Sequence, residues 1–209
     1  MSTAEPLHAS LHSLVSPRVA ASGERGLTIG IAGESGSGKS VTATGLARAL
    51  EESGVRTCVL HQDDYFLLPP RANHEHRCVD LAHVGPHEVN LAMMQSHIAA
   101  FRARRRDVVV PRVDYASDSF GTRDVDFSGV AALIVEGTYV LTLKDLDVGI
   151  FLDATHVETR ERRRARNRDI DAPIIDRVLA IEHRIIAPQA SRAQIVIDRE
   201  FRIRDGRRR

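Results

Sequence analysis

The residues from Gly33 to Ser40 read GESGSGKS and combine three glycines, three serines, one glutamate and one lysine. Glycine tolerates the backbone dihedral angles with which a tight loop points several N–H groups at one anion. In such a loop we expect Lys39 to reach the β- and γ-phosphates of a nucleoside triphosphate and Ser40 to ligate Mg²⁺. The residues predicted to hold the nucleotide are Gly33, Glu34, Ser35, Gly36, Ser37, Gly38, Lys39, Ser40 and Val41.

The segments on either side of this loop are those that a phosphate-binding loop requires. The apolar run 27–33 is typical of a buried parallel strand, and residues 39–53 repeat apolar side chains at helical spacing before Gly54. Gly-x-x-x-x-Gly-Lys-Ser between a strand and a helix is the complete Walker A motif. The alternative is a glycine-rich turn that contains a lysine by chance. It does not explain why a strand precedes and a helix follows the loop, or why every position of the motif is matched. The motif predicts nucleotide binding but leaves the activity open, because many activities share it.

Acidic residues follow two other predicted strands. The strand at 56–64 ends in HQDDYF, and we expect Asp63 to accept a proton from a substrate hydroxyl or to hold Mg²⁺ through water. Asp64 has the alternative role of capping a helix N-terminus. Glu136 ends the strand LIVEG and is predicted to bind Mg²⁺ or a substrate hydroxyl, a capping carboxylate being the alternative.

Arginines are concentrated in the segment RERRRARNRD. On a helix, Arg160, Arg164 and Arg168 would share one face, with Arg163 beside them. Phosphoryl transfer needs cations over the transferring group, so we predict a helical lid over about 156–172. A solvated charged face and a nucleic-acid-binding helix are the alternatives, and the absence of interleaved aromatic residues argues against single-strand stacking.

The order of the remaining elements predicts an α/β protein with a mostly parallel sheet covered on both faces. Residues 1–26 are interpreted as an N-terminal extension with a short helix before Pro17, 27–198 as the core domain, and 199–209 as a basic tail with a disordered end. Further strands are expected at 107–115, 130–137, 148–154 and 193–198, with 107–115 ended or interrupted at Pro111 and 116–129 forming a loop or hairpin. Helices are expected at 86–105 and 172–188, and the segment 65–85 is expected to be irregular because of its Pro-Pro break.

Composition and missing motifs narrow the class of protein. The net charge is +1, two cysteines form no CxxC pair, and no apolar run reaches the roughly 18 residues of a membrane span. These features favour a cytoplasmic protein without a membrane partner, and nucleic acid is not an expected partner. The Asn-Lys-x-Asp element of GTPases and the Ser-Gly-Gly signature of transporter ATPases do not occur. A histidine-rich stretch around 74–87 lacks the spacing of a zinc site and is interpreted as a substrate loop.

The motifs in order resemble the uridine kinase/phosphoribulokinase family of P-loop kinases, including nicotinamide riboside kinases. The resemblance covers about residues 27–198 and rests on GESGSGKS, HQDDYF, VP-x-x-DY, LIVEG, RRRARNRD and IIAPQASRAQIVID. It implies the three-layer P-loop fold with a mostly parallel five-stranded sheet, ATP and Mg²⁺ as cofactors, and a small, nucleoside-like acceptor with a primary hydroxyl. By this match Asp63 is the catalytic base, and Lys39, Arg163 and Arg168 assist the transfer. The residues assigned to the acceptor are Asp63, Tyr65, Arg77, Asp114, Tyr115, Glu136 and Arg164. For Arg77, Asp114 and Tyr115 a purely structural role is the alternative.

Three positions depart from the pattern of uridine kinases. Where those enzymes carry a Tyr, a His and an Arg that help to hold the nucleoside, this sequence has Val113, Asp118 and Phe120. These departures argue against uridine or cytidine as the acceptor. The leading hypothesis is therefore a small-molecule kinase of unassigned acceptor, with a homo-oligomer left open. The rival hypothesis is a nucleotide-dependent switch whose arginine-rich helix grips a protein or a nucleic acid.

Overall fold

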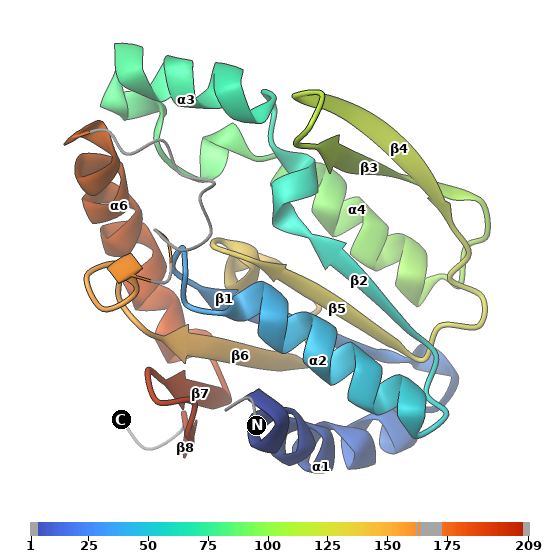
Figure 1. Ribbon diagram of the computed structural model, residues 1–209. Helices are drawn as coiled ribbons and strands as arrows, with labels where there is room; N and C mark the ends of the chain where they lie inside the picture. Colours follow the sequence, from blue (N-terminus) through green and yellow to red (C-terminus); the bar gives the residue numbers. More distant parts are fainter. Residues whose placement is uncertain (1–3, 162, 164–172, 207–209) are drawn as a thin grey trace.

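The computed structural model describes residues 4–161, 163 and 173–206. Among these residues, a six-stranded sheet is formed by β1 (Leu27–Gly33), β2 (Thr57–His61), β5 (Ala132–Gly137), β6 (Val148–Asp153), β7 (Ile195–Asp198) and β8 (Ile203–Asp205). The strand order is β2-β5-β1-β6-β7-β8 (Figure 1). The first five strands pair in parallel, and β8 is antiparallel to β7. The predicted mostly parallel sheet is confirmed, and β8 extends it by one strand.

Helices precede the first strand and lie between later ones. They are α1 (Ala4–Ser22), α2 (Lys39–Glu52), α3 (Pro70–Val79), α4 (Leu91–Arg102) and α6 (Pro173–Ile186). Short 3₁₀ segments lie at Gly23–Arg25, Gln62–Tyr65, Leu81–His83, Pro86–Glu88, Val140–Thr142 and Ala187–Arg192. Within the described residues, none of the helices combines the length and the apolar character that a membrane span requires.

The strands are apolar throughout because both faces of the sheet are covered. In β5, Leu133 and Val135 join a cluster with Met94 and Phe101 of α4. Ile134, between them in the chain, joins a second cluster that includes Leu46 of α2. Since successive residues of a strand point to opposite faces, a sheet between two helical layers needs a continuous apolar run.

The N-terminal helix is longer than predicted and belongs to the core. The prediction that this helix ends before Pro17 is wrong, because α1 continues through Pro17 to Ser22. Its apolar stripe repeats every four residues and is buried against α2 and the sheet. That stripe consists of Leu7, Leu11, Val15 and Val19. Burial of this stripe stabilises the helix enough to offset the loss of the backbone hydrogen bond that Pro17 cannot donate.

Two other expectations about irregular segments are corrected. The segment 65–85 contains α3, which uses Pro70 at its first turn, where a missing N–H costs nothing. Pro111 does not interrupt its strand. β3 (Val108–Asp114) and β4 (Ser119–Val125) form a separate two-stranded hairpin, and both of its strands are edge strands, where proline is tolerated. The helix expected at 86–105 begins only at Leu91, where the Asn90 side chain accepts a hydrogen bond from the Met93 N–H.

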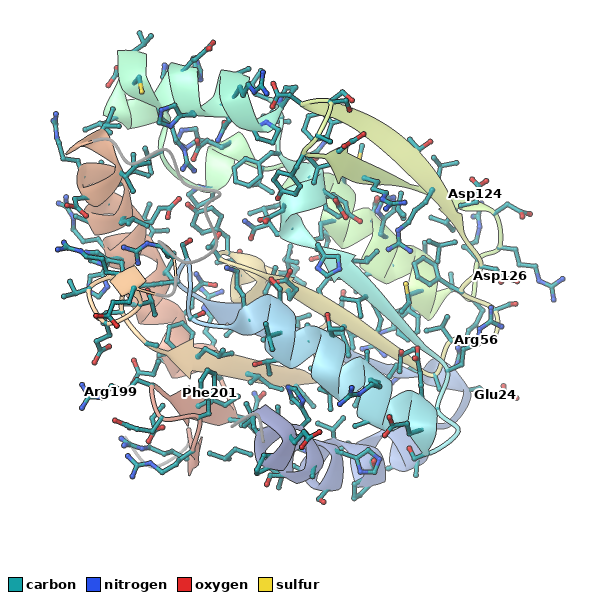
Figure 2. All side chains as sticks on the ribbon, in the orientation of Figure 1. Glu24, Arg56, Asp124, Asp126, Arg199 and Phe201 are labelled. Atoms are coloured by element: carbon teal, nitrogen blue, oxygen red, sulfur yellow. The ribbon has the colours of Figure 1, made fainter. Side chains whose placement is uncertain are left out.

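The basic tail is partly ordered into the sheet. Residues 203–205, within the predicted basic tail at 199–209, form β8, which the sequence did not indicate. Asp198 supports the turn before β8 by accepting hydrogen bonds from the backbone N–H groups of Glu200 and Arg202. Figure 2 shows Arg199 and Phe201 beside these strands, on the opposite side of the molecule from Asp124 of β4. Residues 207–209 lie outside the described residues.

Candidate active site

The phosphate loop connects β1 to α2. Gly36 and Gly38 have φ angles of 76° and 102°, which side chains rarely adopt. A Cβ on Gly36 would lie 2.7 Å from Cγ of Arg163, so the second reason for glycine here is close packing. Because α2 begins at Lys39, its unpaired N-terminal N–H groups face the loop. This is the geometry that an anionic phosphate chain needs.

Glu136 lies directly behind this loop. Ser40 Oγ donates a hydrogen bond to Glu136 Oε1 over 3.1 Å, and His61 Nδ1 lies 2.7 Å from the same oxygen. Burial alone would raise the pKa of Glu136, but the hydrogen bond to His61 and the charge of Lys39 outweigh it and hold the pKa below its ordinary value. The hydrogen bond to Glu136 in turn raises the pKa of His61.

The donor set at Ser40 and Glu136 fits a hydrated Mg²⁺. Glu136 Oε2 is buried and has no hydrogen-bond partner among the residues that the structure describes. A buried carboxylate oxygen without a donor is costly, and it suits a hard cation or one of its water ligands. Ser40 and Glu136 are therefore the residues that would hold the ion.

A cleft of about 590 Å³ opens beside the phosphate loop. Small-molecule sites have volumes on the order of 300–1,000 Å³. Next to the phosphate loop the cleft is lined by Ser35, Lys39, Ser40 and Arg163. Its aromatic and apolar lining residues are Phe66, Leu68, Pro70, Val113, Tyr115, Phe120, Ile175, Val178 and Leu179. The polar residues of the remaining wall are Asp63, Arg71, Asn73, His74, Arg77, Asp118, Thr138 and Glu182. One cleft thus joins a phosphate site to a mixed aromatic and polar site.

The two neighbouring aspartates after β2 have different surroundings. Asp63 lines the cleft, and its Oδ2 accepts a hydrogen bond from the Tyr115 hydroxyl over 3.1 Å. Asp64 Oδ1 instead accepts the backbone N–H of Val113 over 2.9 Å, which fixes β3 against the end of β2. Burial raises the pKa of Asp64. Asp64 is therefore neither the cleft carboxylate nor the predicted helix cap.

A buried charge network forms the wall of the cleft on the side of α6. Arg77 of α3 contacts Glu88 at 2.5 and 2.8 Å and Glu182 of α6 at 3.1 Å. Burial acts to lower the pKa of Arg77, but the two glutamates outweigh it and raise the pKa. Burial raises the pKa of Glu182, which lines the cleft and has a side chain only 10% exposed. Arg77, predicted as an acceptor contact, thus reaches the cleft as part of a fixed ion-pair network.

Several predicted site residues lie elsewhere. Tyr65 is 2% exposed and its hydroxyl lies 2.8 Å from His97 Nδ1, so it belongs to the core rather than to the acceptor wall. Asp114 is exposed and accepts the backbone N–H groups of Ala116 and Ser117 in the hairpin turn. Val41 directly follows Ser40 in the first turn of α2 and is 52% exposed, so its predicted contact with the nucleotide stays a prediction.

The arginine-rich segment is described only in part. Arg163 is 6% exposed, lines the cleft and donates to the carbonyl of His156 at 2.5 Å and to Thr159 Oγ1 at 2.8 Å. Arg164 and Arg168 lie outside the described residues, as does most of the predicted lid over 156–172.

Sequence reasoning missed part of the cleft wall. Phe66 is the last residue of the HQDDYF motif, and Glu182 lies on the same buried face of α6 as Val178 and Leu179. Proximity to the acidic motif could have indicated Phe66. No local signal indicates Glu182, because its partner Arg77 is 105 residues away in the chain.

Comparison with known proteins gives concordant matches. Residues 28–203 match the phosphoribulokinase/uridine kinase family. A uridine kinase from Macrococcus caseolyticus is 28% identical over 183 residues, which cover 81% of this chain and 86% of that protein. A bifunctional alpha-galactosidase/sucrose kinase from Mediterraneibacter gnavus is 29% identical over 191 residues, covering 85% of this chain. The chain spans only 20% of the length of that bifunctional enzyme.

Among solved structures, a candidate fructose transport system kinase from Silicibacter superposes with a TM-score of 0.67 at 23% identity. The match covers 90% of this chain and 95% of the other. At this identity the likeness concerns the fold, and it confirms the predicted α/β architecture.

Proposed function

The chain belongs to the phosphoribulokinase/uridine kinase family of ATP-dependent small-molecule kinases, and we propose that it transfers the γ-phosphate of MgATP to a hydroxyl group of an acceptor held against Asp63. The observation that carries this proposal is the cleft itself. Lys39, Ser40 and Arg163, next to the phosphate loop, line the same cleft as Asp63 and Tyr115.

Each residue has a definite part in the proposed transfer. The loop N–H groups and Lys39 hold the phosphates. Ser40 and Glu136 would hold Mg²⁺, which would neutralise part of the phosphate charge. Asp63 accepts the proton of the acceptor hydroxyl. The hydroxyl oxygen forms a bond to the γ-phosphorus as the bond from that phosphorus to the ADP oxygen breaks. Arg163, close to Gly36, places a cation next to the loop, where charge on the transferring group is stabilised.

The acceptor is proposed to be a polyhydroxylated molecule. Aromatic rings such as Phe66 and Phe120 can pack on the apolar face of a sugar ring, while Asp118 and Glu182 can accept hydrogen bonds from its hydroxyl groups. A nucleoside-like acceptor meets these requirements through its ribose. A free sugar meets them as well, and the kinase activity named for the bifunctional relative is directed at sucrose. Because Val113, Asp118 and Phe120 replace the nucleoside-holding pattern, we favour a free sugar over uridine or cytidine.

The test is an ADP-release assay with MgATP against a panel of acceptors. The panel contains uridine, cytidine, nicotinamide riboside, ribulose 5-phosphate, fructose, glucose and sucrose. We expect one acceptor to give turnover that Asp63→Asn lowers by at least about 100-fold, the lower range for loss of a general base. Asp124→Asn is the matched control, because Asp124 is exposed on β4 (Figure 2) and does not line the cleft.

ATP binding separates this proposal from the switch hypothesis. Asp63→Asn should bind MgATP as the parent protein does, since Asp63 acts on the acceptor. Acceptor-independent ATP hydrolysis that survives Asp63→Asn would contradict the kinase proposal and favour a nucleotide-dependent switch.

A further inference from the structure

Three side chains meet beside the phosphate loop without lining the cleft. Glu34 is the second residue of the loop, His156 lies in the turn after β6, and His183 lies in α6. His156 Nδ1 is 3.1 Å from Glu34 Oε2, and His183 Nδ1 is 2.6 Å from Glu34 Oε1. One ligand atom from each residue can be chosen so that all three lie within 4.8 Å of one another.

Glu34 is a buried carboxylate that faces nitrogen atoms: the backbone N–H of His156 at 2.6 Å and the imidazoles of His156 and His183. Its side chain is 7% exposed, and among the described residues its ion-pair partners are these two histidines. A buried carboxylate is stable only when charge or hydrogen bonds compensate it. A divalent ion bound by the carboxylate and both imidazoles would compensate the buried charge directly.

We propose that Glu34, His156 and His183 bind one divalent transition-metal ion of the Zn²⁺ type, with a fourth position open to water. Two imidazole nitrogens and one carboxylate oxygen form a ligand set that zinc uses with an open position. Mg²⁺ is disfavoured here because it prefers oxygen ligands, so this site is distinct from that at Ser40 and Glu136.

The present spacing is close to what such an ion requires. Ligand atoms about 2.0–2.1 Å from a tetrahedral ion stand roughly 3.3 Å apart. The nitrogen–oxygen distance of 3.1 Å from His156 to Oε2 would widen by about 0.2 Å, and that of 2.6 Å from His183 to Oε1 by about 0.7 Å, to accept the ion. His183 is 39% exposed, which leaves a route from solvent to the open position.

The position of the site gives it a structural consequence. His156 precedes the arginine-rich segment 160–168 and His183 follows it, while Glu34 belongs to the phosphate loop. A bound ion would tie both flanks of this segment to the loop. We therefore expect the ion to stabilise the folded protein whether or not the chain is a kinase.

The test uses the full chain without a histidine tag, stripped of metal and titrated with Zn²⁺ against a chromophoric chelator. We expect one equivalent to bind and to raise the thermal midpoint. Co²⁺ should give the intense visible absorption of a four-coordinate site. His183→Gln should weaken Zn²⁺ binding by at least about tenfold, since even second-shell changes cost 10- to 100-fold. The double variant His156→Gln/His183→Gln should abolish binding of that equivalent.

His87→Gln is the matched control, because His87 is exposed and distant in sequence from the three ligands. It should bind Zn²⁺ as the parent does. Circular dichroism establishes that each variant is folded. Failure of the parent protein to bind one equivalent overturns the proposal without reference to any variant. Unchanged binding by the folded double variant also overturns it and assigns the ion to other histidines.

Discussion

At the scale of single residues, the decisive contact is that between Asp63 and Tyr115. The two residues are 52 positions apart, yet the Tyr115 hydroxyl lies 3.1 Å from Asp63 Oδ2. Such a donor fixes the carboxylate and leaves its other oxygen available to a substrate hydroxyl. Tyr115 is thus proposed as a positioning residue for the base.

Tyr115→Phe tests that role. We expect kcat/KM for the acceptor to fall about three- to tenfold, which corresponds to the usual 0.5–1.5 kcal/mol of one hydrogen bond. The thermal midpoint should not change, because the Tyr115 side chain is 48% exposed. An unchanged kcat/KM would show that the hydroxyl does not position Asp63.

At the scale of elements, α1 is a structural part of the core. Leu11 is fully buried in the cluster between α1, α2 and the sheet, whereas Leu14 on the same helix is 43% exposed. The helix therefore contributes to stability through one stripe only.

Leu11→Ala should lower the free energy of unfolding by about 2–5 kcal/mol, the usual cost of a buried leucine cavity. Leu14→Ala should lower it by no more than about 0.5 kcal/mol, as expected for a surface site. Urea unfolding of both variants measures the difference. Equal effects of the two substitutions would refute the docking of α1 through this stripe.

Asp147, just before β6, connects several elements through an ion-pair network. Its carboxylate accepts the Thr28 N–H of β1 over 2.8 Å and contacts Arg102 of α4 at 2.5 Å and Arg25 at 2.6 Å. Burial alone would raise the pKa of Asp147, but these hydrogen bonds and charges outweigh it and hold the pKa below its ordinary value.

This shift predicts a pH dependence of stability. The folded-state pKa lies below the unfolded value of about 3.9, so the stabilisation is fully present above that value and is lost as pH falls through the folded-state pKa. Asp147→Asn should therefore destabilise the protein at pH 7 and progressively less toward pH 3. Unfolding free energies of both proteins across this range provide the measurement. A constant difference at every pH would rule out the carboxylate charge as the cause.

At the scale of the whole molecule, nucleotide binding should stabilise the fold. The phosphate loop links β1 to α2 at the centre of the sheet, and a ligand that binds only the folded state shifts the unfolding equilibrium. At about 100 times its Kd, MgATP should add about 2.7 kcal/mol, or roughly 5–10 °C in thermal midpoint for a chain of this size.

The two lysines of the chain provide a matched pair for this measurement. Lys39→Ala should remove most of the MgATP-induced shift, because the loop loses its only side-chain cation. Lys144→Ala should leave the shift intact, because Lys144 is exposed before β6. Comparable shifts in both variants would show that MgATP binds somewhere other than the phosphate loop.

Features that depend on one short segment were predictable from the sequence. GESGSGKS dictates its own turn through the dihedral freedom of Gly36 and Gly38, and the apolar runs of β1, β5 and β6 require burial on both faces. The order of these elements then predicts the parallel sheet, the phosphate loop and the position of Asp63 at a strand end.

Other features were decided only by the tertiary structure. The contacts between Tyr115 and Asp63, between Glu182 and Arg77, and between α1 and α2 join positions far apart in the chain. No local pattern encodes such pairs, because each depends on how two complete elements pack. Packing likewise made a continuous helix through Pro17 and buried Tyr65 beside His97. The energy of burial, summed over both partners, outweighs the local preference of either segment.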